Sequence, residues 1–420
     1  MKTEMDRPTI TPCARLLFSG LSAWLLLAAA LLALQPTATW ALGFRIPNQD
    51  AASTARGNAF TATADNPSAI YYNPAGITQL SGQNMQFGLH VISVNSSYNG
   101  PGGIHAESES EIQPVPQLYY TRSLPDSRWS YGLGIYAPFG LSIEWPDDAS
   151  FSKSALEGDL MTVAVNPVVA YKLTDTLSIA AGPSIDYSRV KLRQGIPAPV
   201  PGEVIFRGDG FSASFTAGLL WQPHPKWSFG ASYRYSSNIE HEGHLRTQDT
   251  IPALTGRVPT SAELQFPQYV RGGVSFRPTT NWNFEVDFDW TDWDNLNSVT
   301  FEGSSKLFGT DFVFPLHWES SWLAHLGATR YLKNGWWVSA GYFFSQNSTS
   351  EKYFNPVVPD TDLHVGSLGF GRKGRTWSWA LSGQIITGPD REVNNSVFTQ
   401  ANGKYHWFNQ AVNASIAYHF

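Results

Sequence analysis

One short stretch of the sequence carries imidazole and carboxylate side chains of the kind that bind zinc. Its members are Glu240, His241, Glu242 and His244. A zinc site requires three or four ligands at defined spacings, and no third ligand stands at a standard spacing from the two histidines. The stretch falls in a long polar segment, so we expect a solvated loop here rather than a metal site.

A second group offers carboxylates that could bind calcium. It consists of Asp287, Asp289, Asp292 and Asp294. The glycine and the terminal glutamate of an EF-hand loop are absent. Asp287 and Asp289 alternate with apolar residues, so we expect them on one face of a strand that lines a water-filled interior. No metal and no other cofactor is predicted.

Nucleophilic catalysis has little support in the sequence. The only cysteine is Cys13, which lies ahead of the apolar core of an N-terminal export signal and is lost with it. No glycine-rich phosphate loop and no nucleophile elbow is present. Serine, histidine and asparagine all occur, but no motif groups them. We therefore expect a protein without enzymatic activity.

The first 41 residues are typical of a signal peptide. The basic start holds Lys2, Arg7 and Arg15, and the apolar run LLFSGLSAWLLLAAALLAL follows. Thr39 and Ala41 are small residues that suit a cleavage site before Leu42. A retained membrane helix is the alternative because the run is long enough to span a bilayer. No basic segment follows it to stop transfer, which favours cleavage.

Composition narrows the fold class of the remaining chain. Charged residues make up 15%, aromatic residues 14%, and the mean hydropathy is −0.21. This composition is unlike a helical membrane bundle and suits a transmembrane β-barrel, which has an apolar outer face, a polar lumen and aromatic interfaces. Without the signal, 25 basic residues remain of 28 and 32 acidic residues of 34, a net charge of −7. That balance argues against a nucleic-acid partner.

A period of two dominates the sequence after residue 82. In NWNFEVDFDWT, an apolar stripe alternates with a polar one and ends in tryptophan at both edges, as is typical of a strand that crosses a membrane. Such segments predict about fourteen strands, starting near residues 83, 113, 128, 158, 176, 209, 226, 266, 281, 319, 335, 362, 376 and 405. Short links such as LTDT and RKGR alternate with long irregular polar stretches such as residues 237–264, 292–318 and 387–404.

This alternation of short and long connections predicts an all-β transmembrane barrel over residues 83–420. Short turns lie on the periplasmic side of outer-membrane barrels, and long loops lie outside. The final strand ends on Phe420. A terminal phenylalanine resembles the signal that the outer-membrane assembly machinery reads, so we expect that machinery as a partner.

Residues 42–82 do not alternate and are rich in small residues. In NPSAIYYNP, Asn66 can cap a helix, Pro67 suits its first position and Pro74 cannot continue it. A helix this short needs support from its surroundings. We expect residues 42–82 to form a partly helical hatch that plugs the barrel lumen.

The N-terminal segment also carries a resemblance. Gly43 and Phe44 at the mature start, followed by Asn73-Pro74-Ala75 just before the first strand, resemble the FadL family of outer-membrane transporters. Segments such as YGLGIYAPFG and the closing KYHWFNQAVNASIAYHF are similar to barrel segments of that family. The resemblance implies a fourteen-stranded barrel with an N-terminal hatch. It also implies a monomer that takes up long-chain fatty acids or, alternatively, monoaromatic hydrocarbons such as toluene.

The resemblance further implies that the substrate leaves sideways through a kinked third strand. Prolines weaken barrel strands because they remove a ladder donor, and the first strands contain Pro116, Pro138, Pro167 and Pro183. We predict a break in the wall at Pro138, Phe139 and Gly140, with Asn73, Pro74 and Ala75 abutting it from inside. The alternative places these prolines harmlessly at strand ends.

Ligand contacts are predicted at two levels of the barrel. Phe44 and Ile46 resemble the segment that lines the family's inner pocket, and we expect Tyr136 and Phe139 on strand 3 to add to that pocket. Plug packing alone is the alternative for each of them. Outer capture is expected from apolar loop residues: Ile196, Pro197, Val200, Val204, Ile251 and Leu254. A general porin without a hatch, or a barrel enzyme such as a lipase, would be an alternative of another class.

Overall fold

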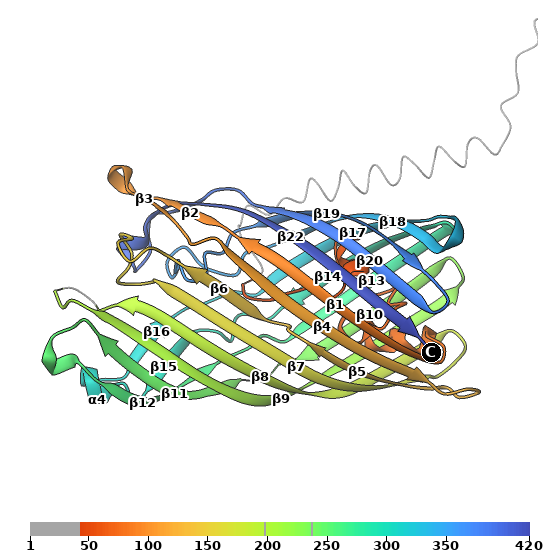
Figure 1. Ribbon diagram of the computed structural model, residues 1–420, viewed down its shortest axis with the longest axis horizontal. Coiled ribbons are helices and arrows are strands. Elements are labelled where there is room, and N and C mark those ends of the chain that lie inside the picture. The colour runs from red at the N-terminus through yellow and green to blue at the C-terminus, as the bar shows by residue number, and fades with distance from the viewer. Residues whose placement is uncertain (1–42, 197–198, 237) are drawn as a thin grey trace, which may run out of the picture. The chain divides into compact units, whose positions relative to one another are not determined.

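The computed structural model describes residues 43–196, 199–236 and 238–420, so the predicted signal peptide and Pro197 lie outside the described residues. Residues 83–420 form a closed antiparallel β-barrel of 14 strands (Figure 1). The first strand, β1 (Gln83–Val94), pairs with the last, β22 (Gly403–His419), and closes the wall. Among the described residues, no helix is long and apolar enough to span a membrane.

The predicted starts of the wall strands are confirmed to within three residues, except that β9 begins six residues earlier than predicted. Between β1 and β22 the wall contains β4 (Glu111–Ser123), β5 (Trp129–Tyr136) with β6 (Gly140–Glu144), β7 (Glu157–Lys172), β8 (Leu177–Gly195), β9 (Glu203–His224), β10 (Trp227–Tyr235), β13 (Tyr269–Thr279), β14 (Trp282–Thr291), β17 (Ser321–Tyr331), β18 (Trp336–Ser345), β19 (Leu363–Lys373) and β20 (Trp377–Thr387).

The long connections are more regular than predicted. They contain β2 (Ser96–Asn99), β3 (His105–Glu107), β11 (Ile239–Gln248), β12 (Arg257–Leu264), β15 (Ser298–Glu302), β16 (Phe312–Pro315) and β21 (Arg391–Val393), with the short helix α4 (Ser305–Phe308). β11 pairs with β12 and with residues 203–209 of β9. The sheet therefore continues, toward the long loops, beyond the part of β9 that pairs with β10. The expectation of irregular loops over residues 237–264 and 292–318 was therefore wrong.

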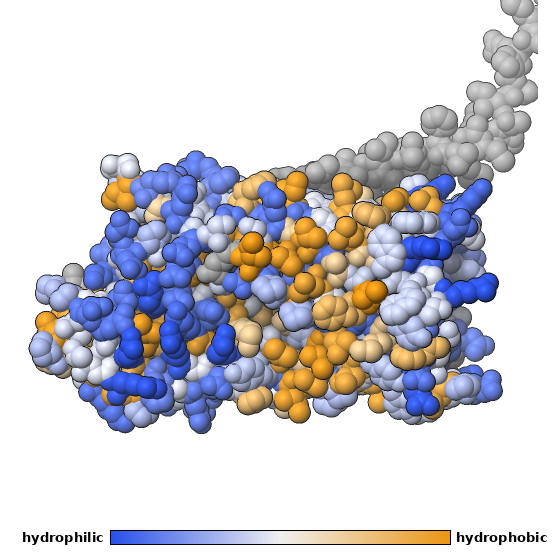
Figure 2. Space-filling view, viewed as in Figure 1, coloured by the Kyte–Doolittle hydropathy of each residue, from blue (hydrophilic) through white to orange (hydrophobic). Residues whose placement is uncertain are grey.

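On the face that Figure 2 shows, apolar residues gather in a band across the middle of the barrel, with polar residues toward both ends of its long axis. On β14, for example, Phe284 and Phe288 face outward and are exposed, while Glu285, Asp287 and Asp289 face inward and are buried. The alternation therefore separates a lipid-facing side from the lumen, as the sequence predicts.

Residues 43–82, called here the N-terminal segment, lie inside the barrel and contain three short helices: α2 (Ala51–Thr54), α3 (Ala69–Tyr72) and η1 (Pro74–Gln79) (Figure 1). Asp50 caps α2 through the amide of Ser53 at 3.0 Å. Asn73 caps η1 through the amide of Ala75 at 3.2 Å, with Pro74 at its first position. Helices this short hold their shape only because the lumen surrounds them.

The third wall strand is interrupted. β5 ends at Tyr136, opposite Ala164 of β7, and β6 begins at Gly140, opposite Met161. Residues 137–139 therefore face only two residues of β7, which is a β-bulge. Pro138 lies in this break, while Pro116, Pro167 and Pro183 lie inside β4, β7 and β8. The alternative interpretation, in which all four prolines stand at strand ends, is wrong for these three.

Candidate functional site

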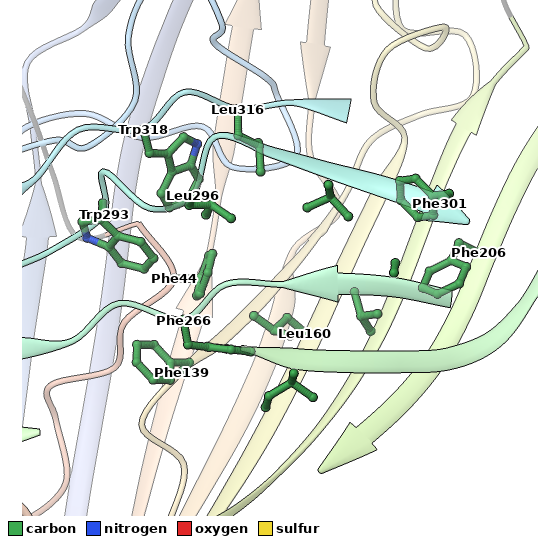
Figure 3. Close-up of a cluster of buried hydrophobic side chains, with 14 of the residues drawn as sticks. Phe44, Phe139, Leu160, Phe206, Phe266, Trp293, Leu296, Phe301, Leu316 and Trp318 are labelled. Carbon is green, nitrogen blue, oxygen red and sulfur yellow. The ribbon is translucent and has the colours of Figure 1, made fainter. Parts of the chain in front are cut away.

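Phe44 lies at the centre of a buried aromatic cluster in the lumen (Figure 3). Its ring centroid is 4.7 Å from that of Trp293, 5.3 Å from Trp318, 5.8 Å from Phe266 and 6.0 Å from Phe139. These rings come from the N-terminal segment, the break in the third strand, and the connections that precede β13 and follow β14. They meet only because the chain closes into a barrel around its own N-terminus.

The apolar cluster continues away from Phe44 toward the long-loop end. Phe206 of β9 and Phe301 of β15 form its far end in Figure 3, and their ring centroids are 5.0 Å apart. Between the two ends lies a cavity of about 80 Å³. Its apolar lining consists chiefly of Phe44, Leu160, Val190, Phe206, Phe301 and Trp318. The lumen thus contains a continuous apolar region from the outer strands to Phe44.

The backbone of the N-terminal segment pairs with the break in the third strand. The amide of Ile46 donates to the carbonyl of Pro138 at 2.9 Å, and the amide of Gly140 donates to the carbonyl of Phe44 at 2.9 Å. Gln49 adds a side-chain bond from Nε2 to the carbonyl of Ala137 at 2.6 Å. Residues 44–49 therefore supply backbone partners that the bulge would otherwise leave unmade.

A single hydroxyl completes the break on its other side. Thr162 Oγ1 on β7 accepts from the amide of Phe139 at 3.1 Å and donates to the carbonyl of the same residue at 2.6 Å. A side-chain hydroxyl can satisfy both groups because it is donor and acceptor together. Both backbone groups of Phe139 in the break are therefore hydrogen-bonded.

A seam in the wall lies beside the break. β4 pairs with β5 only from Leu118 and Ile135 toward the short-turn end. Beyond that point β4 is paired with β1, and β6 is paired with β7. The next backbone bond across the seam joins the amide of Glu109 to the carbonyl of Glu144 at 2.8 Å. Within the described chain, no strand pairing joins β4 to β6 between these two points.

The inward face of β14 binds the N-terminal segment along its length. Glu285 accepts from the amide of Ala62 at 2.7 Å, and Asp287 accepts from the amides of Phe60 and Thr61 at 2.8 and 2.9 Å. Both carboxylates are buried. The prediction that Asp287 and Asp289 line a water-filled interior was therefore wrong, because the N-terminal segment fills the space in front of them.

Asp289 binds the start of the segment. Its carboxylate accepts from Arg45 Nη2 at 2.7 Å and from Arg271 Nε at 2.8 Å, and all three side chains are buried. Arg45 Nη1 also donates to Thr291 at 2.9 Å, and its guanidinium lies 3.8 Å from the ring centre of Tyr269. The ion pairs hold the residue next to Phe44 in one position.

Tyr136 is buried, but not in the apolar cluster around Phe44. Its hydroxyl donates to Asn166 Oδ1 at 2.9 Å and accepts from Arg234 Nη1 at 2.7 Å, and its ring packs on Tyr71 and Tyr119. Arg234 is in turn paired with Asp186 at 2.9 Å. The structure therefore separates Tyr136, which serves a polar network, from Phe44 and Phe139, which share one apolar cluster.

Asn73, Pro74 and Ala75 bind elsewhere on the wall. Asn73 Nδ2 donates to the carbonyl of Thr61 at 2.8 Å and to that of Leu219 on β9 at 2.9 Å. Gly218 of β9 lies directly against Asn73 and Pro74, since a Cβ there would stand 2.4 Å from Asn73 Oδ1. The backbone bonds at the break come instead from residues 44–49, with Ile46 beside Gly140.

The outer residues divide into two groups. Ile196 and Val204 belong to the buried cluster and Val200 packs on it, whereas Ile251 is exposed and Leu254 only partly buried. His241, predicted in a solvated loop, is instead buried on β11, 2.8 Å from Ser188 Oγ, and lines the cavity. Its period-two spacing with Ile239 and Leu245 was the available signal. The described residues contain no group of three ligands for a metal.

The loop between β18 and β19 contacts Gly43, the first described residue of the N-terminal segment. Asp360 accepts from the amide and hydroxyl of Ser348 at 2.8 and 2.9 Å, and also from the amide of Gly43. Burial of this carboxyl group raises its pKa to about 6, against the opposing effect of these bonds. Asp360 therefore joins an outer loop to the start of the N-terminal segment.

A second cavity, of about 620 Å³ and lined by both polar and apolar side chains, lies at the end that holds the C-terminus. Its lining includes Asp50, Arg56, Asn66, Trp337 and Phe420. It lies between the N-terminal segment and the wall formed by β17 to β22.

Comparisons with known proteins agree with this architecture. A long-chain fatty acid transport protein of Salmonella typhi is 22% identical over 381 residues, covering 81% of this chain and 86% of the relative. The crystal structure of a Pseudomonas aeruginosa FadL homologue matches with a TM-score of 0.77 at 20% identity, covering 90% of this chain and 99% of that one. The Pseudomonas putida toluene transporter TodX matches with a TM-score of 0.68 at 16% identity, covering 91% and 99%.

A family model described as outer membrane protein transport protein (OMPP1/FadL/TodX) matches residues 32–379. This match spans the N-terminal segment, the strand break and most of the barrel. The chain belongs to this family of outer-membrane transport proteins.

Proposed function

We propose that this barrel imports hydrophobic molecules across the outer membrane, with long-chain fatty acids as its principal substrates and the N-terminal segment as its hatch. The supporting observation is the buried apolar region that runs from the outer strands to Phe44 and ends at the break in the third strand. Relatives named as long-chain fatty acid transport proteins are similar over most of the chain.

A route of this kind matches the physical problem. Moving a fatty acid into water costs about 0.8 kcal/mol per CH₂ group, so a water-filled pore gives little advantage. A series of apolar contacts, followed by an exit into the membrane, avoids that cost. The seam between β4 and β6 lies beside the break and provides such an exit, once the backbone bonds of Phe44 and Ile46 to the break are released.

We assign different roles to the predicted gate residues. Pro138, Phe139 and Gly140 form the gate itself, and Phe44 and Ile46 close it. Asn73, Pro74 and Ala75 anchor the far part of the hatch to β9 and stay in place. Phe44 and Phe139 are the ligand contacts that the geometry supports best. Ile46 affects transport by closing the gate, and Tyr136 supports the wall through its hydrogen bonds to Asn166 and Arg234 rather than by contact with the ligand.

An acidic head group is favoured by unused donors around Arg45, the residue that follows Phe44. Arg271 Nη1 and Nη2 and the Tyr269 hydroxyl are buried and have no hydrogen-bond partner among the described residues. Arg271 lies next to Arg45 on the other side of Asp289, so two cations share one carboxylate. A buried guanidinium with free donors is suited to a carboxylate, which distinguishes fatty acids from neutral hydrocarbons.

Monoaromatic hydrocarbons remain the second candidate. The cavity beside Phe44 holds about 80 Å³, which suits a compact ring better than a long chain unless the cluster opens. The toluene transporter TodX shares the fold. Binding of hexadecanoate and of toluene to the purified protein separates the two candidates.

We assign this barrel no catalytic role, since the relatives with curated names are transport or outer-membrane proteins. We also propose that the protein is a monomer whose insertion uses the assembly machinery through Phe420. Phe420 is exposed at the end of the wall and its amide bonds to the carbonyl of Gln83 at 3.0 Å.

A substitution at Gly140 tests the gate. A Cβ at this position would stand 2.8 Å from Ile46 Cδ1, so Gly140→Leu should obstruct the passage. Gly366 on β19 has nothing within 4 Å of an added Cβ, so Gly366→Leu is the matched control. We expect oleate uptake to fall in Gly140→Leu cells and to stay normal in the control, with equal amounts of folded barrel. Normal uptake by Gly140→Leu would refute the gate.

A further inference from the structure

The six short turns carry a strong excess of positive charge. We define the turn ring as residues 122–128, 172–176, 222–226, 277–281, 330–335 and 372–376. It contains ten basic residues: Arg122, Arg128, Lys172, Lys226, Arg277, Arg330, Lys333, Arg372, Lys373 and Arg375. It contains two acidic residues, Asp126 and Asp175. Each of the six turns has at least one basic residue, so the charge surrounds the barrel.

The rest of the mature chain has the opposite balance. Residues 43–420 contain 25 basic and 32 acidic residues, so 15 basic and 30 acidic residues lie outside the turn ring. The positive ring therefore does not reflect a basic protein. It is a local feature of one end of an acidic one.

Most of these cations have no acidic partner. Arg128 lies 4.0 Å from Asp175 and Arg277 lies 3.9 Å from Asp65. For the other eight basic residues of the turn ring, no ion pair is formed within the described part of the chain. Ion pairs within the protein therefore do not account for the ring.

The cations stand next to aromatic residues at the edge of the apolar band. Trp129 follows Arg128, Trp227 follows Lys226, and Trp377 lies two positions after Arg375. Trp129 and Trp377 are 45% and 55% exposed. The guanidinium of Arg330 lies 4.9 Å from the ring centre of Trp282. Tryptophan occupies the membrane interface, so these cations lie at the level of lipid head groups, as Figure 2 shows for the polar rim beyond the band.

We propose that the turn ring binds anionic phospholipid head groups, such as phosphatidylglycerol, in the periplasmic leaflet of the outer membrane. Lysine and arginine bind phosphate oxygens through charge-assisted hydrogen bonds. A bilayer leaflet surrounds the barrel, as the charges do, whereas an acidic protein partner would require them on one side. The inference is independent of the transported substrate.

The test compares two triple variants of the full mature protein. Arg372→Gln, Lys373→Gln and Arg375→Gln together remove three exposed charges from the turn ring. Arg207→Gln, Arg246→Gln and Arg257→Gln together remove three exposed charges from β9, β11 and β12 at the opposite end. Each protein is reconstituted in mixtures of phosphatidylglycerol and phosphatidylcholine. Quenching of tryptophan fluorescence by brominated forms of either lipid gives their relative binding constants.

We expect the wild type and the opposite-end variant to prefer phosphatidylglycerol, and the turn variant to lose much of that preference. Each cation near an anionic surface strengthens binding roughly fivefold, so three cations amount to a loss of up to about 100-fold. The preference should also weaken with salt. Equal binding of the two lipids by the wild type, or an unchanged preference in the turn variant, would overturn the proposal. Binding of soluble polyglutamate without any lipid preference would do so too, in favour of an acidic protein partner.

Discussion

Replacement of Asp289 by asparagine should release the start of the N-terminal segment from the barrel. The carboxylate lies 2.7 Å from Arg45 Nη2 on the segment and 2.8 Å from Arg271 Nε on the wall. The variant Asp289→Asn keeps the shape of the side chain and removes the negative charge that these two buried cations share.

The magnitude follows from the burial of all three side chains. Breaking a buried ion pair by removing one partner costs about 3–5 kcal/mol. Opening of the segment returns Arg45 to water and leaves Arg271 in the wall, so we take the lower value for the docking of the segment. A loss of about 3 kcal/mol corresponds to an opening equilibrium roughly 150-fold more populated.

Hydrogen exchange measures this opening directly. The amides of Ile46 and Thr54 are bonded to the carbonyls of Pro138 and Asp50, each at 2.9 Å, and exchange only when the segment opens. In Asp289→Asn we expect peptides over residues 43–54 to exchange roughly 100-fold faster, with β8 and β9 unchanged. Glu302→Gln removes an exposed charge from β15 and should change nothing.

A double variant guards against simple misfolding. Arg45→Met removes the cation that Asp289→Asn leaves unpaired, so the combination should exchange more slowly than Asp289→Asn alone. Unchanged exchange over residues 43–54 in Asp289→Asn would refute the view that this ion pair docks the segment. Faster exchange throughout the barrel would assign Asp289 to the wall instead.

Three further predictions concern the break, the head group and the outer loop. Thr162→Val removes the hydroxyl that bonds both backbone groups of Phe139. The closed break should lose about 1–3 kcal/mol of stability. An unchanged rate of amide hydrogen exchange at Phe139 and Gly140 would contradict this. Arg271→Met should weaken hexadecanoate binding about tenfold or more and leave hexadecanol binding unchanged in calorimetry, and an equal loss for both would exclude a carboxylate contact. Asp360 has a folded pKa of about 6 against 3.8 in the unfolded chain, so the folded state retains this proton as pH rises. Stability should therefore fall by up to about 3 kcal/mol between pH 4 and pH 6. The urea midpoint of Asp360→Asn should lack that component, and a pH profile equal to the wild type would refute it.

The barrel was predictable because its signal is local. Alternation along each strand and the contrast of short and long connections do not depend on distant contacts, so the fourteen wall strands begin within about six residues of their predicted positions. The extensions β11, β12 and β15 were missed because polar residues dominate their exposed face outside the membrane. His241 shows this, since Ile239 and Leu245 are the only buried apolar residues at alternate positions of β11, and Thr247 continues that face with a polar side chain.

The interior was less predictable because it depends on partners far apart in the sequence. The sequence predicts that Asp287 faces a water-filled lumen, whereas its carboxylate accepts hydrogen bonds from the amides of Phe60 and Thr61. Every residue except proline has a backbone amide, so the sequence does not indicate which amides will bind a distant carboxylate. The break at Pro138 to Gly140 was visible as a proline and a glycine, whereas its backbone partners, Phe44 and Ile46, required the folded chain.

We propose that Phe44 and Ile46 must leave the break before a substrate can pass. The mature chain is expected to lack cysteine, so two engineered disulfides can test it without interference. One joins Ile46→Cys to Gly140→Cys across the break. The matched control joins Thr78→Cys to Ser178→Cys, whose hydroxyls are 2.8 Å apart in the anchored part of the segment.

Oleate uptake by cells with each oxidised disulfide is the decisive measurement. We predict that the disulfide at the break abolishes uptake until it is reduced, while the disulfide at η1 leaves uptake unchanged. Full uptake with residues 46 and 140 covalently joined would show that the substrate does not pass through this break.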